Sequence, residues 1–147
     1  MKHTHKGGLL TEAVLETFKL NGLLVTTGDQ LIKELGITSA RWKILGALSY
    51  SDSAMTVPDI ARAMGQTRQA VQRLVTEMIE DGLLELLNNP KHQRANLLSL
   101  TNKGQNTFSK VMEKQIPWVN SIAQDIRKED LNTVVTTLKY LNAYLGE

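Results

Sequence analysis

The sequence around Gly65 constrains the fold of this chain most, because it predicts two short helices joined by a tight turn. Thr56 and Asp59 have the spacing of a capping box, so a first helix is expected over residues 57–64. Gly65 ends this helix, since glycine readily adopts the left-handed conformation found after helix ends. Thr67 can then cap a second helix. Two helices separated by a short turn with glycine in it predict a helix-turn-helix.

The second helix, expected to end near Asp81, has an outer face without acidic residues. From Ile60 to Thr76 the sequence contains arginines and no aspartate or glutamate. Apolar residues at helical spacing are expected to face the core, and they are Ala70, Val71, Leu74, Val75, Met78 and Ile79. Arginine donates two hydrogen bonds to guanine and glutamine pairs with adenine, whereas phosphate repels a carboxylate. The face therefore indicates double-stranded DNA as a partner, contacted by Thr67, Arg68, Gln69, Gln72, Arg73 and Thr76.

A basic β-hairpin is predicted directly after this helix. The segments LLELL (83–87) and ANLLSL (95–100) alternate apolar and polar residues, which is typical of half-buried strands. Their connection, NNPKHQR (88–94), predicts a protruding loop in which Lys91 and Arg94 contact the DNA backbone or minor groove. A solvated surface would explain each piece separately, but it would not explain why they are adjacent.

Long helices are expected at both ends of the chain, over about 9–35 and 101–145. Their apolar faces exceed what one small lobe would cover, so we expect a second copy of the chain to cover them in a homodimer. The alternative is a monomer whose terminal helices pack only on each other. The expected organisation is a disordered tail at 1–8 and a single domain at 9–147, with dimerisation helices at 9–37 and 101–147 around a DNA-binding lobe at 38–100.

Residues 55–104 resemble the winged helix-turn-helix of the MarR family of transcriptional regulators. Ala61, Gly65 and Val71 match the small residue, turn glycine and buried branched residue of that pattern, and DGLLE and LSLTNKG match the segments that flank the hairpin. The resemblance implies a mainly α fold with a small β-hairpin wing and long N- and C-terminal dimerisation helices. It also implies a repressor that binds a pseudo-palindromic operator, with half-sites about 34–36 Å apart.

The family also suggests two features beyond the recognition helix. MarR-like proteins often bind a small aromatic or anionic effector between the dimerisation helices and the lobe, where Arg41 and Trp42 are the matching candidates. A tryptophan at helical spacing with Leu45 is more often a core residue than a pocket wall. Arg94 matches the wing arginine that approaches the minor groove. The family usually has an aspartate two residues earlier, which orients this arginine, and this chain has His92 there instead.

The composition gives no support to catalysis. There is no cysteine, which excludes a thiolate nucleophile, a thiol switch and cysteine-based metal sites. His3 and His5 could hold a transition metal, but we interpret them as incidental residues of a flexible tail. We therefore expect no enzyme activity, no metal and no cofactor.

Two further expectations concern partners and location. No apolar run approaches the roughly 18 residues of a membrane span, and the first residues lack the apolar core of a signal peptide, so a cytoplasmic protein without membrane association is expected. The main alternative function is a winged-helix module that binds a protein and not DNA. Such an interface more often exposes aromatic and aliphatic side chains where this chain has arginine and glutamine.

Overall fold

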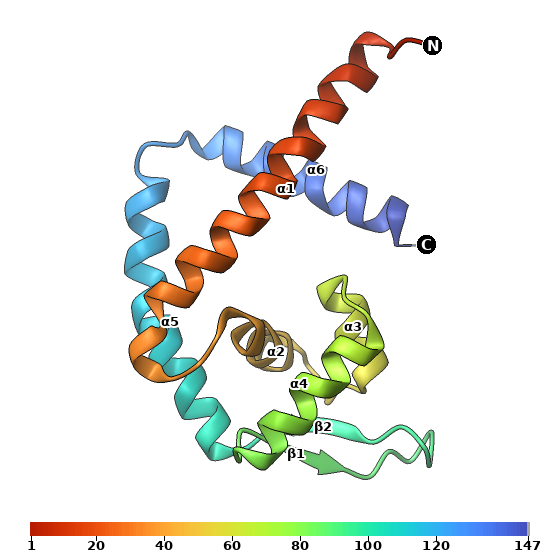
Figure 1. The fold of residues 1–147 in the computed structure, drawn as a ribbon, viewed down its shortest axis with the longest axis vertical. Coiled ribbons are helices and arrows are strands. Elements are labelled where there is room, and N and C mark those ends of the chain that lie inside the picture. The colour runs from red at the N-terminus through yellow and green to blue at the C-terminus, as the bar shows by residue number, and fades with distance from the viewer. Residues whose placement is uncertain (147) are drawn as a thin grey trace.

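Six α-helices, one short 3-10 helix and a two-stranded antiparallel hairpin make up residues 1–146, which are the residues described by the computed structural model. In chain order they are α1 (His5–Leu31), the 3-10 helix η1 (Lys33–Leu35), α2 (Ser39–Tyr50), α3 (Val57–Met64), α4 (Arg68–Glu80), β1 (Leu84–Leu87), β2 (Leu97–Leu100), α5 (Asn102–Ala123) and α6 (Lys128–Leu145). Helices α2 to α4 and the hairpin form a lobe, and α1 and α5 lead away from it towards α6 (Figure 1). The expected mainly helical fold with a hairpin wing is confirmed.

The first helix begins earlier than the sequence suggested. The Thr4 hydroxyl accepts a hydrogen bond from the Gly7 amide at 3.0 Å and caps α1, so helix starts at His5 and not at Leu9. Residues 5–8, expected to be disordered, are therefore helical. Gly22 and Gly28 do not interrupt α1, which ends at Leu31 and not near residue 35.

The two helices around Gly65 form as predicted. The Thr56 hydroxyl accepts from the Asp59 amide at 3.2 Å, and the Asp59 carboxylate accepts from the Thr56 amide at 3.0 Å, which completes the capping box. Hydrogen bonding of the Asp59 carboxylate to the Thr56 backbone amide and then to the Thr56 side chain, with a smaller contribution from the Arg62 guanidinium, holds the pKa of Asp59 below its ordinary value. Gly65 follows α3 with φ of 63°, in the left-handed region. Local capping therefore fixes both ends of α3 and, through Gly65, the start of the turn that leads into α4.

One hydrophobic core holds the lobe together and orients α4. The largest side chains that are fully buried come from the residue directly before η1 and from α2, α3, α4, β2 and α5. They are Ile32, Ile44, Leu45, Ile60, Val71, Val75, Met78, Leu98 and Val111. Three of these belong to α4, on the stripe that the sequence predicted. Because that stripe is buried, the opposite side of α4 must face outward.

The hairpin differs from the prediction in its details. The strands pair from Leu84 with Leu100 to Leu87 with Leu97, which leaves a nine-residue loop at 88–96 in place of the seven residues expected. The Leu98 amide also donates to the Met55 carbonyl at 2.8 Å, an additional strand-like pairing that the sequence did not predict. Leu84 is buried but Leu86 is 52% exposed, because β1 extends beyond the core into an open groove.

The terminal helices bury very little of their apolar surface within one chain. Helix α6 contains no buried residue, and Gly28 is the one buried residue of α1. The exposed apolar side chains of these helices include Leu15, Phe18, Leu23, Leu131, Val134, Val135, Leu138 and Leu145. Packing of the terminal helices on each other within a monomer therefore does not cover these faces. Within residues 1–146, no helix combines the length and the apolar character needed to span a bilayer.

Candidate nucleic-acid interface

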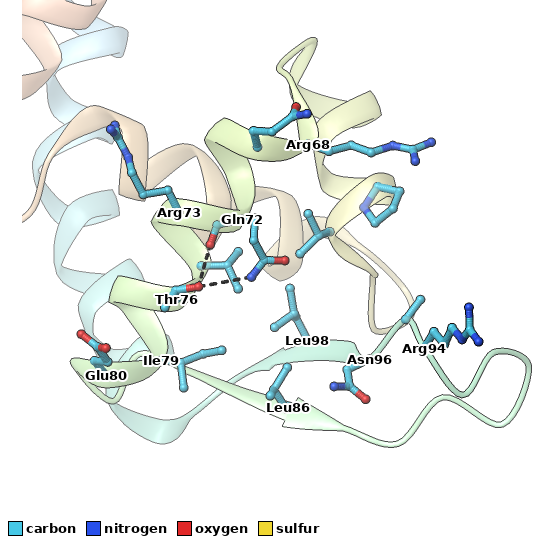
Figure 2. A pocket seen from close by; sticks show the side chains of 15 residues that line it. Arg68, Gln72, Arg73, Thr76, Ile79, Glu80, Leu86, Arg94, Asn96 and Leu98 are labelled. Carbon is cyan, nitrogen blue, oxygen red and sulfur yellow. Dashed lines mark hydrogen bonds between the residues drawn. The ribbon is translucent and has the colours of Figure 1, made fainter.

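A groove of about 920 Å³ lies between α4 and the hairpin, which is called the wing below (β1, β2 and the loop 88–96). Its apolar floor includes Ile79, Leu86 and Leu98, and Figure 2 shows these side chains between the helix and the strands. Six of the eight residues predicted to contact DNA line it: Arg68, Gln69, Gln72, Arg73, Thr76 and Arg94. The fold thus brings the helix face and the wing arginine to one concave surface.

The register of α4 fixes which side chains it presents. The Thr67 hydroxyl accepts from the Ala70 amide at 3.2 Å and caps the helix, as predicted. All the predicted contact residues on α4 are exposed, while Val71 and Val75 on the opposite face are buried. The arginine and glutamine side chains are therefore free to meet a partner without unfolding the lobe.

Gln72 and Thr76 are joined by hydrogen bonds one helical turn apart. The side-chain Nε2 of Gln72 donates to Thr76 Oγ1 at 3.2 Å, and Thr76 Oγ1 donates to the backbone carbonyl oxygen of Gln72 at 2.9 Å (Figure 2). The side-chain amide of Gln72 still has one N–H donor and its own oxygen as an acceptor, and this is the pair that adenine requires. Thr76 therefore positions Gln72 in addition to facing the groove itself.

The three arginines of the groove form no ion pair with the carboxylates of residues 1–146. Arg68 and Arg73 extend from opposite sides of α4, and Arg94 lies towards the tip of the wing (Figure 2). One acidic side chain, Glu80, lines the groove at the C-terminal end of α4. The remaining surface is cationic and amide-bearing, which suits a phosphate backbone and base edges.

An asparagine that sequence reasoning missed shapes the wing loop. The Asn89 Nδ2 donates to the Ala95 carbonyl at 2.9 Å, and Asn89 Oδ1 accepts from the Lys91 amide at 3.0 Å. Asparagine side chains commonly form such turns, so the residue type was the available signal. Lys91 and His92 are exposed on this loop, and Lys91 lies outside the groove lining.

A second cavity, of about 600 Å³, lies among α1, α2, α3 and α5. Trp42 lines it together with Trp118, and Tyr50 and Phe108 line it as an edge-to-face pair with ring centres 5.8 Å apart. Lys43 supplies a cation among the lining residues. The cavity is thus aromatic with one positive group.

Arg41 is absent from the lining of this second cavity. Its guanidinium instead pairs with Asp81 at 2.5 Å and Glu77 at 3.5 Å. The structure therefore brings one of the two effector candidates, Trp42, to the cavity and places Arg41 elsewhere, because Glu77 of α4 and Asp81, which follows α4 directly, hold it.

Comparisons with known proteins match this architecture. The family model described as MarR family matches residues 35–95. An uncharacterized protein of Mycobacterium tuberculosis, Rv2011c, is 35% identical over 88% of this chain and 90% of its own length. The crystal structure of AbsC, a MarR family transcriptional regulator from Streptomyces coelicolor, is 25% identical and superposes with a TM-score of 0.79 over 99% of this chain and 97% of AbsC. The chain belongs to the MarR family.

Other similar proteins include regulators whose names state a partner or a role. The transcriptional activatory protein BadR of Rhodopseudomonas palustris is 28% identical over 84% of this MarR-family chain and 71% of BadR. The fold is shared with M. tuberculosis MosR in complex with DNA (TM-score 0.73, 19% identity, 90% and 97% coverage). It is also shared with CouR from Rhodococcus jostii RHA1 bound to p-coumaroyl-CoA (TM-score 0.76, 17% identity, 84% and 87% coverage).

Family membership decides the class of function. A MarR-family chain with this winged helix-turn-helix is a DNA-binding transcriptional regulator and not an enzyme.

Proposed function

We propose that this MarR-family protein binds a pseudo-palindromic operator as a homodimer and represses transcription there. The observation that carries the proposal is the outward face of α4. Its arginines have no carboxylate partner among residues 1–146, and the Gln72 side chain is oriented by its hydrogen bond to Thr76. A helix of this kind fits the major groove and reads bases, while the wing arginine contacts the backbone or minor groove. A dimer that covers a promoter in this way excludes the polymerase.

The uncovered apolar faces of α1 and α6 support the homodimer. Contiguous exposed apolar surface of this extent is typical of an interface, and a two-fold axis presents the same face twice. The two recognition helices would then meet half-sites about 34–36 Å apart, one turn of the duplex.

The cavity lined by Trp42 supports release of the operator by a small effector. Its aromatic walls and Lys43 suit a planar aromatic anion. Such a ligand changes DNA affinity only if it binds one arrangement of the two lobes better than the other.

Selection of bound fragments from random duplex DNA tests the proposal. The expected outcome is a recovered motif with two-fold symmetry, whose affinity falls steeply between two salt concentrations. Recovery of no motif, with binding to no duplex at low salt, would favour the protein-interaction module. Placing the recovered motif between a promoter and a reporter then tests repression, and activation of the reporter would contradict that part of the proposal.

Replacing Arg73 by alanine is expected to weaken binding to the recovered operator by about 1–3 kcal/mol, the value of a two-pronged contact to guanine. Arg73→Lys keeps the charge but loses the planar fork, so it should lose most of the same discrimination while binding random duplex normally. Fluorescence anisotropy with both duplexes measures the two effects. Full operator affinity in Arg73→Ala would remove Arg73 from the base-reading residues.

Replacing Arg94 by alanine is expected to weaken binding to all duplexes and to lower the salt dependence by about one phosphate contact. Titrations at several salt concentrations give that slope. Arg127→Ala, which removes an exposed arginine at the turn between α5 and α6, is the matched control and should leave the slope unchanged. An unchanged slope in Arg94→Ala would argue against a role for the wing.

A further inference from the structure

The C-terminal end of the recognition helix α4 is fastened to α2 by one arginine. Arg41 Nη1 lies 2.5 Å from Asp81 Oδ2, and Arg41 Nη2 lies 3.5 Å from Glu77 Oε2. The Arg41 side chain is 21% exposed, and it spans two elements that are far apart in sequence. We call Arg41, Glu77 and Asp81 the Arg41 clamp.

A second set of contacts fastens the same turn to the start of α5. Lys103 Nζ donates to the Asp81 carbonyl at 2.7 Å, and Thr101 Oγ1 donates to the Gly82 carbonyl at 2.5 Å. The end of α4 is therefore held from two sides, while its beginning is tied to α3 by the turn at Gly65. On the side of α2, Arg41 supplies the ion pairs that hold this end of α4.

The turn of α2 that carries Arg41 is itself attached to α1. The Ser39 amide donates to Asp29 Oδ1 at 2.6 Å, and the Ser39 hydroxyl donates to the Val25 carbonyl at 3.2 Å. Ser39 is buried, and Gly28 approaches so closely that a Cβ there would lie 2.6 Å from Ser39 Oγ. Residues 39–41 thus contact α1 through Ser39 and the end of the recognition helix through Arg41.

We propose that Arg41 is a positioning residue that sets the tilt of α4 relative to α1, and thereby the half-site spacing that the dimer accepts. The inference rests on the proposed function. A dimer holds its two α1 helices at one separation, so the angle between α1 and α4 fixes the separation of the two recognition helices. Ser39 and Trp42 of the same turn line the effector cavity, so a molecule there would act on the turn that carries Arg41.

The alternative is that Arg41 only neutralises two carboxylates, and the two roles predict different results. Without Arg41, uncompensated negative charge would weaken binding to every duplex and change its salt dependence. Loss of positioning would instead reduce discrimination between correctly and incorrectly spaced half-sites, with little effect on random duplex.

The experiment uses three duplexes: the operator recovered by selection and two derivatives whose half-sites are moved one base pair closer or further apart. In Arg41→Gln, the preference for the recovered spacing is expected to fall by about fivefold, equivalent to about 1 kcal/mol at 1.4 kcal/mol per tenfold. Affinity for random duplex and its salt dependence should stay as in the wild type. The control Arg127→Gln removes a more exposed arginine–carboxylate pair, in the turn between α5 and α6 and outside the contacts of α4, and it should change neither quantity.

Partner variants keep the test decisive if Arg41→Gln does not fold. Asp81→Asn should reproduce the loss of spacing preference. The double variant Arg41→Gln with Asp81→Asn should lose no more of this preference than either single variant. The charge-swapped pair Arg41→Asp with Asp81→Arg should recover part of the preference. Wild-type spacing preference in the folded single variants, or losses that simply add, would overturn the proposal. Failure to recover any operator would instead contradict the proposed function, so the two failures are distinguishable.

Discussion

Introducing aspartate at Leu138 is expected to separate the dimer into monomers and to lower operator affinity by roughly 10²- to 10⁴-fold, the gain that linking two binding modules supplies. Leu138 lies at the middle of the apolar stripe of α6 and is 42% exposed in the single chain. In the dimer a charge at this position would be buried without a partner, which is strongly unfavourable. Sedimentation equilibrium measures the association, and anisotropy with the recovered operator measures the affinity.

A matched control is available on the same helix. Thr136 lies on nearly the opposite side of α6 and is exposed, so Thr136→Asp adds the same charge away from the apolar stripe. It should remain dimeric and bind the operator normally. A dimeric Leu138→Asp with wild-type affinity would show that α6 is not part of the interface.

Replacing Gly104 by alanine is expected to lower the free energy of unfolding by about 1–3 kcal/mol, or more, because it overpacks a rigid site. Alanine normally stabilises a helix interior by about 1 kcal/mol relative to glycine, so the expected sign is reversed here. A Cβ at Gly104 would overlap the carbonyl oxygen of Leu83. That carbonyl cannot move freely, since it accepts from the Thr101 amide at 3.1 Å.

Denaturant unfolding at a fixed protein concentration measures this change, because dimerisation makes apparent stability depend on concentration. Gly8→Ala is the control: a Cβ at Gly8 would meet no atom within 4 Å, so this variant should gain up to about 1 kcal/mol from helix propensity. If Gly104→Ala were as stable as Gly8→Ala, the close packing of α5 against the backbone of Leu83 would not be a constraint on the fold.

Much of the DNA-binding lobe could be predicted because its signals are local. The capping box at Thr56, the turn glycine at position 65 and the cap at Thr67 each act within one helical turn, so the residue types nearly determine the geometry. The inward stripe of α4 follows from helical periodicity, and the outward face follows from the stripe. The residues that α4 contributes to the groove could be predicted for the same reason.

The errors arose where the signal was weak or the contact was distant. The start of α1 was placed too late because a single threonine cap in a polar, glycine-bearing segment gives little periodicity to detect. The pairing of Met55 with Leu98 and the position of Leu86 in the groove depend on how the hairpin sits against the lobe.

The sequence by itself determined the order and the amphipathic register of the elements, because caps, turns and periodic faces depend on neighbours a few residues away. Only the tertiary structure decided that Arg41 lies away from the cavity lined by Trp42 and pairs at the end of the recognition helix, and that Gly104 lies against the backbone of Leu83. Both contacts join residues at least twenty positions apart. The relative orientation of the elements that carry these residues is set by the packing of the shared core. No local pattern encodes that orientation, since it results from all the buried side chains together.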